Sequence, residues 1–118
     1  MNLTRGCEWV IEAHGCDAAA LRDVSRLESL FAAIIRDMSL HAVREPAWHQ
    51  FPEPGGVTGM ALLSESHLTC HTFPEYRSMC LNLFCCRERP DWDFDAALRD
   101  ALGASLVHVR RIDRPYQL

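Results

Sequence analysis

The chain has 118 residues, of which 24% are charged, and a formal net charge of -4 at pH 7. This length is enough to bury a hydrophobic core without disulfides or a metal, so we expect one domain spanning residues 1–118. The slightly acidic composition gives no electrostatic reason to expect nucleic acid or an anionic membrane, because both require a concentrated basic surface. A small molecule or another protein is the expected partner.

All 12 basic residues are arginine. The absence of lysine excludes pyridoxal enzymes and lysine aldolases, because both form an imine on a lysine side chain. Imine chemistry in this chain therefore needs a carbonyl from another source. We expect the six cysteines to be reduced thiols in the cytoplasm, because the first residues lack the charged and apolar segments of a secretion signal. No apolar run approaches the length of about 20 residues that a membrane helix requires.

The first half of the chain predicts a strand, a long helix and a second strand. The segment CEWVIEAHGC alternates apolar and polar residues, which predicts a strand that ends at Gly15. Asp17 can cap a helix, and apolar residues from Leu21 to Met38 recur at spacings of three and four, which predicts a helix of about 20 residues. The segment LHAVREPAWHQF predicts a second strand, and Pro46 favours an edge position or a bulge because it cannot donate a hydrogen bond within a sheet.

The second half predicts two central strands, a helix and a last strand. Val57–Thr72 and Ser78–Cys86 are densely apolar and each predicts a strand inside a sheet. The segment DWDFDAALRDALG predicts a helix that stops at Gly103, and SLVHVRRI predicts the last strand. Successive strands joined by turns favour an α+β fold, a two-layer sandwich of a mostly antiparallel sheet with two helices on one face.

One predicted strand contains an unusual set of reactive side chains, within LLSESHLTCHTFPE. Ser66 follows Glu65, and His71 comes five residues after the serine. Cys86 lies twenty residues after the serine, at the end of the next predicted strand. A hydrolase serine would prefer a sharp G-x-S-x-G turn, which this segment lacks. The pattern therefore favours a role for Ser66 other than that of a hydrolase nucleophile.

The segment GGVTGMALLSESHLTCHTFPE, together with LNLFCC, resembles the processing and active-site core of the prokaryotic S-adenosylmethionine decarboxylases. The resemblance implies a pyruvoyl-dependent enzyme whose proenzyme cleaves itself between Glu65 and Ser66, into a β chain of residues 1–65 and an α chain of residues 66–118. Ser66 would become a covalent pyruvoyl group, so that neither pyridoxal phosphate nor a metal is needed. The substrate amine would form an imine with this ketone, which accepts electrons as pyridoxal does elsewhere.

The resemblance also implies roles for single residues near the cleavage point. His71 would be the base that removes the α-proton of Ser66 during processing, and Thr58 would help to polarise the carbonyl of Glu65. Cys86 would be the acid that reprotonates the substrate after carbon dioxide leaves. A thiol suits this role because its ordinary pKa of about 8.5 leaves it protonated at neutral pH.

Three further residues are expected to contact the substrate. Phe51 would stack on an adenine, and Phe73 and Glu75 would form part of the substrate wall. The family usually has tryptophan at the position of Phe73, glycine at that of Arg87 and aspartate at that of Asn82. These departures bear on the identity of the substrate more than on the processing pair.

The predicted strand Val57–Thr72 determines which of the candidate side chains share a face of the sheet. Residues of even separation share a face in an unbroken strand, so Thr58 and Ser66 should point to one face and His71 to the other. A bulge, or an end of the strand near Cys70, would be required to turn His71 back.

Several functional hypotheses follow. The first is an S-adenosylmethionine decarboxylase that supplies the aminopropyl donor for spermidine synthesis, and the second is an ornithine or arginine decarboxylase on the same fold. The third is a non-catalytic binding homologue. A metal site is not expected, because Cys85 and Cys86 should point to opposite faces and no C-x-x-C pair exists. A sheet covered on one face favours a homodimer, and the resemblance implies a dimer of processed protomers.

Overall fold

The computed structural model describes residues 5–117, so residues 1–4 and 118 at the ends of the predicted domain lie outside the described part. Six strands and three helices follow one another along the chain, with a short 3₁₀ turn at Pro74–Tyr76. They are β1 (Arg5–His14), α1 (Ala18–Leu21), α2 (Val24–Asp37), β2 (Ala47–Gln50), β3 (Val57–Leu62), β4 (Ser66–Phe73), β5 (Ser78–Cys85), α3 (Phe94–Leu102) and β6 (Leu106–Pro115).

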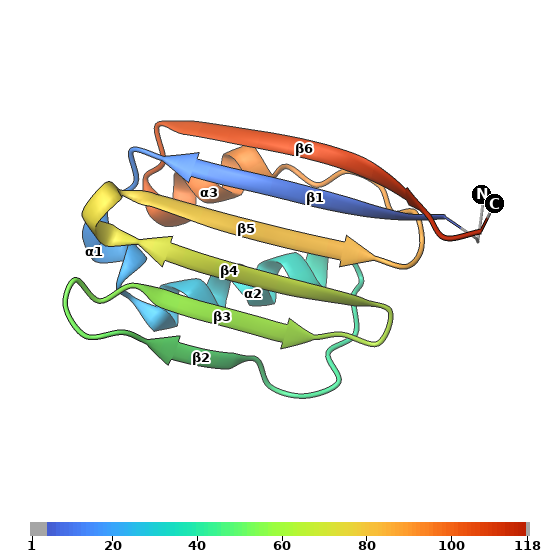
Figure 1. The fold of residues 1–118 in the computed structure, drawn as a ribbon, viewed down its shortest axis with the longest axis horizontal. Helices are drawn as coiled ribbons and strands as arrows, with labels where there is room; N and C mark the ends of the chain where they lie inside the picture. Colours follow the sequence, from blue (N-terminus) through green and yellow to red (C-terminus); the bar gives the residue numbers. More distant parts are fainter. Residues whose placement is uncertain (1–4, 118) are drawn as a thin grey trace.

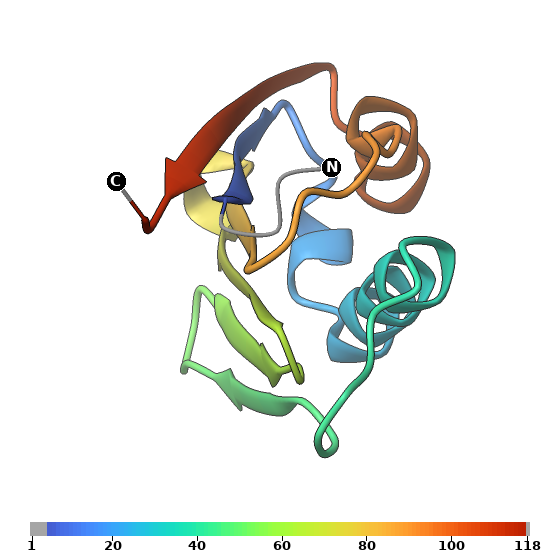
Figure 2. The ribbon, with the colours of Figure 1, turned by 90° about the vertical axis from the view of Figure 1, so that its right-hand side faces the viewer.

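The strands form one sheet in the order β2-β3-β4-β5-β1-β6, in which every neighbouring pair is antiparallel (Figure 1). All three helices lie on the same side of this sheet, which gives two layers (Figure 2). The predicted α+β sandwich is therefore confirmed. We call the sheet face opposite the helices the open face, because no element of the described chain covers it.

The long helix predicted after Asp17 is divided into α1 and α2. Asp17 caps the first, and its side chain accepts a hydrogen bond from the amide of Ala19 at 3.1 Å. Asp23 caps the second, and its side chain accepts from the amide of Arg26 at 3.3 Å. A capping carboxylate satisfies amides that the first helical turn leaves without partners. The second aspartate therefore starts a new helix where the apolar spacing alone predicted continuity.

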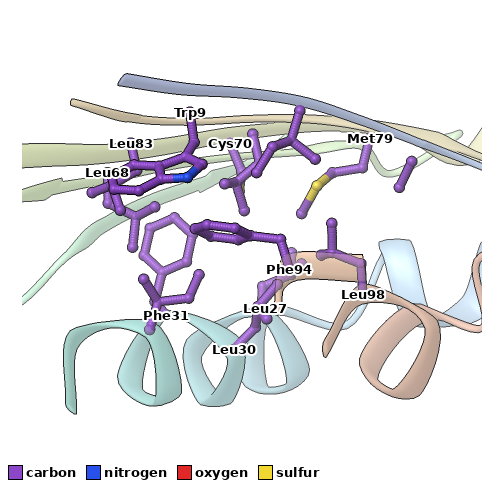
Figure 3. Close-up of a cluster of buried hydrophobic side chains, with 14 of the residues drawn as sticks. Trp9, Leu27, Leu30, Phe31, Leu68, Cys70, Met79, Leu83, Phe94 and Leu98 are labelled. Carbon is purple, nitrogen blue, oxygen red and sulfur yellow. The ribbon is translucent and has the colours of Figure 1, made fainter. Parts of the chain in front are cut away.

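The core lies between the sheet and the helices (Figure 3). Trp9 from β1, Phe31 from α2 and Phe94 from α3 are its largest side chains, and each is at most 1% exposed. The rings of Trp9 and Phe94 lie with their centroids 5.9 Å apart in a tilted arrangement. Such aromatic contacts between layers contribute beyond the area they bury. The core therefore fixes the sheet against the helices and leaves the open face available.

The single strand predicted over Val57–Thr72 is wrong, because the structure has two strands there. β3 ends at Leu62, the chain reverses over residues 63–65, and β4 begins at Ser66. The resulting register places Thr58 opposite His71. These two residues share the open face, and Ser66 has the parity of the buried β4 residues. The predicted separation of Ser66 from His71 is therefore confirmed, whereas the predicted sharing of one face by Thr58 and Ser66 is wrong. Apolar content alone cannot distinguish one long strand from a hairpin, and the polar triplet Ser-Glu-Ser marks the reversal.

Candidate active site

The predicted cleavage point lies at the β3–β4 reversal, beside the end of β5. Ser66 is half-buried and pairs with Cys85 across the sheet. The backbone amide of Cys86 donates a hydrogen bond of 2.8 Å to the carbonyl oxygen of Glu65. This carbonyl belongs to the Glu65–Ser66 peptide bond. A donor held at that oxygen polarises the carbonyl and can stabilise negative charge that develops there.

The two adjacent cysteines at the end of β5 have opposite environments. Cys85 is 1% exposed in the core, and burial raises the pKa of its thiol to about 11. Cys86 is exposed and its backbone contacts Glu65. The strand alternation predicted from the sequence therefore separates an inert thiol from an accessible one. Of these two cysteines, Cys86 is the one available as a proton donor to a bound molecule.

Thr58 and His71 form a second group of polar side chains, on the open face. The hydroxyl of Thr58 and Nδ1 of His71 share a hydrogen bond of 3.1 Å between β3 and β4. This contact follows from the register, which places the two residues opposite each other. A hydrogen bond at one ring nitrogen fixes the orientation of a histidine and determines its tautomer. His71 is thus held as an oriented, exposed imidazole.

A hollow of about 370 Å³ lies beside this pair. Its lining includes all three residues predicted to contact the substrate, Phe51, Phe73 and Glu75, together with Thr58 and His71. The side chain of Phe51 is 50% exposed and that of Phe73 is 37% exposed. Exposed aromatic rings beside a hollow can stack on a flat heterocycle, and a carboxylate can accept hydrogen bonds from hydroxyl or amino groups.

The cleavage point and the Thr58–His71 pair lie far apart within one chain. His71 follows Ser66 by five residues on β4, and at about 3.3 Å per residue their Cα atoms are about 17 Å apart. The two side chains also have opposite parity along the strand. Proton transfer requires contact at about 2.6–3.2 Å. One chain therefore brings Glu65, Ser66 and Cys86 together, but does not bring His71 to them.

Sequence reasoning missed two further residues in line with His71. Cys80 on β5 lies opposite His71, and Glu12 on β1 lies opposite Cys80. The pKa of the Cys80 thiol is raised, first by burial and then by the Glu12 carboxylate. Glu12 also forms an ion pair with Arg110 of β6. No pattern in the sequence could show this row, because it depends on how strands distant in the chain are aligned.

Arg87, after β5, and Asn82, within β5, entered the sequence analysis only as departures from the family pattern, and both have charged partners in the structure. Nε of Arg87 lies 3.1 Å from a carboxylate oxygen of Glu65, and a guanidinium nitrogen of Arg89 lies 3.9 Å from the same oxygen. Asn82, where the family usually has aspartate, donates a hydrogen bond of 2.6 Å to the carboxylate of Glu8. An aspartate at this position would place a second negative charge against the carboxylate of Glu8. The neutral amide of Asn82 avoids this repulsion and donates a hydrogen bond instead.

Residues 5–117 contain neither a metal-binding cluster nor a membrane-spanning helix. No cluster of three or more histidine, cysteine, aspartate or glutamate side chains there could hold a metal ion. Among the helices of the same residues, none is long and apolar enough to cross a membrane.

Comparison with known proteins identifies the family. A family model described as S-adenosylmethionine decarboxylase matches residues 7–115. S-adenosylmethionine decarboxylase proenzyme 2 of Halalkalibacterium halodurans is 36% identical over 98% of this chain and 92% of its own length. The corresponding proenzyme of Moorella thermoacetica is 34% identical over 87% of this chain and 82% of its own length.

A solved structure supports the same fold. The crystal structure of the adenosylmethionine decarboxylase from Aquifex aeolicus superimposes with a TM-score of 0.78 at 20% identity, and the match covers 98% of this chain and 94% of that one. At this identity the likeness concerns the fold, and it includes nearly the whole of both chains. Together with the match over residues 7–115, it leads to one conclusion: the chain belongs to the S-adenosylmethionine decarboxylase family.

Proposed function

We propose that the protein is a self-processing, pyruvoyl-dependent S-adenosylmethionine decarboxylase that supplies the aminopropyl donor for spermidine synthesis. The observation that carries this proposal is the Glu65–Ser66 peptide bond, which lies at a strand reversal with its carbonyl oxygen held by the amide of Cys86 at 2.8 Å. In a chain of this family, that arrangement prepares one bond for cleavage.

Processing begins with attack of the Ser66 hydroxyl on the carbonyl carbon of Glu65. The amide C–N bond breaks and an ester links Glu65 to the serine oxygen, while the amide of Cys86 stabilises the transient oxyanion. A base, which we assign to His71, then removes the α-proton of Ser66. The bond between Cβ and the ester oxygen breaks, and Glu65 leaves as a carboxylate. Water hydrolyses the resulting dehydroalanine, after tautomerisation, to release ammonia and form the pyruvoyl group.

The pyruvoyl ketone supplies the electron sink for decarboxylation, in place of pyridoxal phosphate. The chain's own residues would then position the substrate and move protons. Phe51 and Phe73 would stack on its adenine, and Glu75 would accept hydrogen bonds from its polar groups. Cys86 would donate a proton to the α-carbon after carbon dioxide leaves.

The distance between Ser66 and His71 supports a homodimer with composite sites. A second copy, packed open face to open face with its strands reversed, would bring its Thr58–His71 pair to the β3–β4 reversal of the first copy, beside the main chain of Ser66, whose side chain has the opposite parity. The open face carries large exposed apolar side chains, among them Met60 at 56% and Leu62 at 51% exposure. Exposed apolar surface of this kind is typical of an interface. Two-fold symmetry would give two equivalent sites, each built from both protomers.

Intact mass spectrometry and decarboxylation assays test this proposal together. We expect the purified protein to consist of two chains, residues 1–65 and residues 66–118, and the second to begin with a ketone that borohydride reduces. Ser66→Ala should remain one chain. S-adenosylmethionine should release carbon dioxide, whereas ornithine and arginine should not. A single uncut chain without a reducible ketone would contradict the proposal, and release from ornithine or arginine would replace the assigned substrate.

A further inference from the structure

Two arginines lie beside the Glu65–Ser66 bond, in the segment that follows β5. Nε of Arg87 is 3.1 Å from the side-chain carboxylate of Glu65, and a terminal nitrogen of Arg89 is 3.9 Å from it. The hydrogen bond from Cys86 to the carbonyl of Glu65 holds this segment against the cleavage point. Both guanidinium groups therefore lie beside the side chain of Glu65, the residue whose carbonyl forms the scissile bond.

The two guanidinium groups together exceed the charge of the Glu65 side chain by one positive unit. The other charged residues of the segment have partners elsewhere. Glu88 forms an ion pair with Arg5. Asp91 forms one with Arg111 at 2.7 Å. These carboxylates therefore leave an excess of positive charge beside the bond that is to be cut.

Arg89 also retains capacity to donate hydrogen bonds. One of its terminal nitrogens donates to the carbonyl of Met38 at 3.4 Å. Its Nε is buried and has no hydrogen-bond partner within residues 5–117. A buried donor without an acceptor is unfavourable, because it has lost its hydrogen bonds to water. An additional acceptor beside Arg89 would therefore be stabilised.

The proposed processing reaction creates such an acceptor at Glu65. In the elimination step a base takes the α-proton of Ser66, the bond between Cβ and the ester oxygen breaks, and the electron pair remains on the leaving carboxylate. Negative charge thus develops on the main chain of Glu65. We propose that Arg87 and Arg89 stabilise this leaving carboxylate and so accelerate the elimination step. The inference rests on the proposed function, and the single excess positive charge matches the single negative charge that the step produces.

The position of Arg87 makes this inference specific to the chain. The resemblance stated from the sequence implies glycine at this position, so the guanidinium is an addition to the processing residues that the resemblance implies. Arg87→Gly should consequently fold and should still form the ester. A guanidinium keeps its positive charge at every pH used for assay and can bind a carboxylate with two donors. These properties suit the stabilisation of a carboxylate that appears only when the chain is cut.

The experiment measures the time course of self-cleavage after a pulse of cell-free synthesis. Wild-type protein is compared with Arg87→Gln, Arg87→Gly, Arg89→Gln and the charge-conserving Arg87→Lys. Arg99→Gln is the matched control, because it removes a cation from α3 near the opposite end of the sheet, where Arg99 contacts Asp95 and Ser105. Hydroxylamine is added at intervals, because it cleaves an ester and yields a residue 66 that is still serine.

We expect the neutral variants to produce the ketone-bearing chain about tenfold more slowly, since the side chain of Arg87 is 55% exposed and solvent screens its charge. They should accumulate a hydroxylamine-sensitive ester. Arg87→Lys should be slowed less, and Arg99→Gln should match wild type. Wild-type rates in the neutral variants, or slow variants that accumulate only the intact amide, would overturn the inference. An equal delay in Arg99→Gln would also overturn it, and a wild-type chain that never cleaves would refute the proposed function itself.

Discussion

The composite site can be tested by complementation between two inactive variants. His71→Ala lacks the proposed base, and Ser66→Ala lacks the residue to be converted. General bases contribute about 10²–10⁴-fold to a rate, so His71→Ala alone should process at least about a hundredfold more slowly than wild type. Ser66→Ala should not process. If His71 acts on its own chain, mixing the variants restores nothing, because no chain holds both residues.

The structure favours the opposite result. About 17 Å of strand separates Ser66 from His71 in one chain, which is several times the reach of a proton transfer. In a mixed dimer, Ser66 of the His71→Ala chain meets His71 of the Ser66→Ala chain. Random pairing of equal amounts gives a mixed partner to about half of the His71→Ala chains, so about half should be cut.

The assay is co-expression of the two variants with different affinity tags, followed by mass spectrometry of each chain. His71→Asn serves as a second variant of comparable volume, in case alanine perturbs the fold. The composite site is refuted if mixed dimers form, as purification through both tags would demonstrate, and the His71-substituted chain remains uncut. It is also refuted if wild-type protein held as a monomer by dilution processes at the full rate.

Three further predictions concern the hydrogen-bonded pair, the core and a buried thiol. Thr58→Val removes the 3.1 Å contact to His71 and should slow processing about tenfold, whereas Thr58→Ser should retain most of the rate, as a time course of chain cleavage would detect. Trp9→Ala should lower the free energy of unfolding by about 3–5 kcal/mol, whereas Tyr76→Ala at an exposed site should change it by less than about 0.5 kcal/mol, both measured by urea denaturation. Burial raises the pKa of Cys70 from 9.0 to about 12 in the folded protein, so its contribution to stability is complete below pH 9 and is lost as the pH rises from there towards 12. Urea midpoints that decline between pH 8 and 11, and decline less in Cys70→Ala, would agree with this; identical declines would contradict it.

Local patterns predicted most of the elements correctly, because they depend on neighbours in the chain. Alternation predicted that Cys85 and Cys86 point to opposite faces, and the structure places one in the core and the other at the surface. The same kind of reasoning failed where it placed Thr58 on the same face as Ser66. Periodicity reports which residues share a face only while the strand continues, and here the chain reverses between Leu62 and Ser66.

The amino-acid sequence by itself determined the chemistry that the chain can perform: it contains no lysine for an imine, and it places a serine after a glutamate with a histidine and a cysteine at set distances. The tertiary structure decided which of these groups meet. Hydrogen bonding between β4 and β5 brings Cys86 to the carbonyl of Glu65, and pairing of β3 with β4 joins Thr58 to His71 at the other end of the strand. Such contacts depend on strand register across residues far apart in the chain, and register is set by packing against the whole core, which no local pattern encodes.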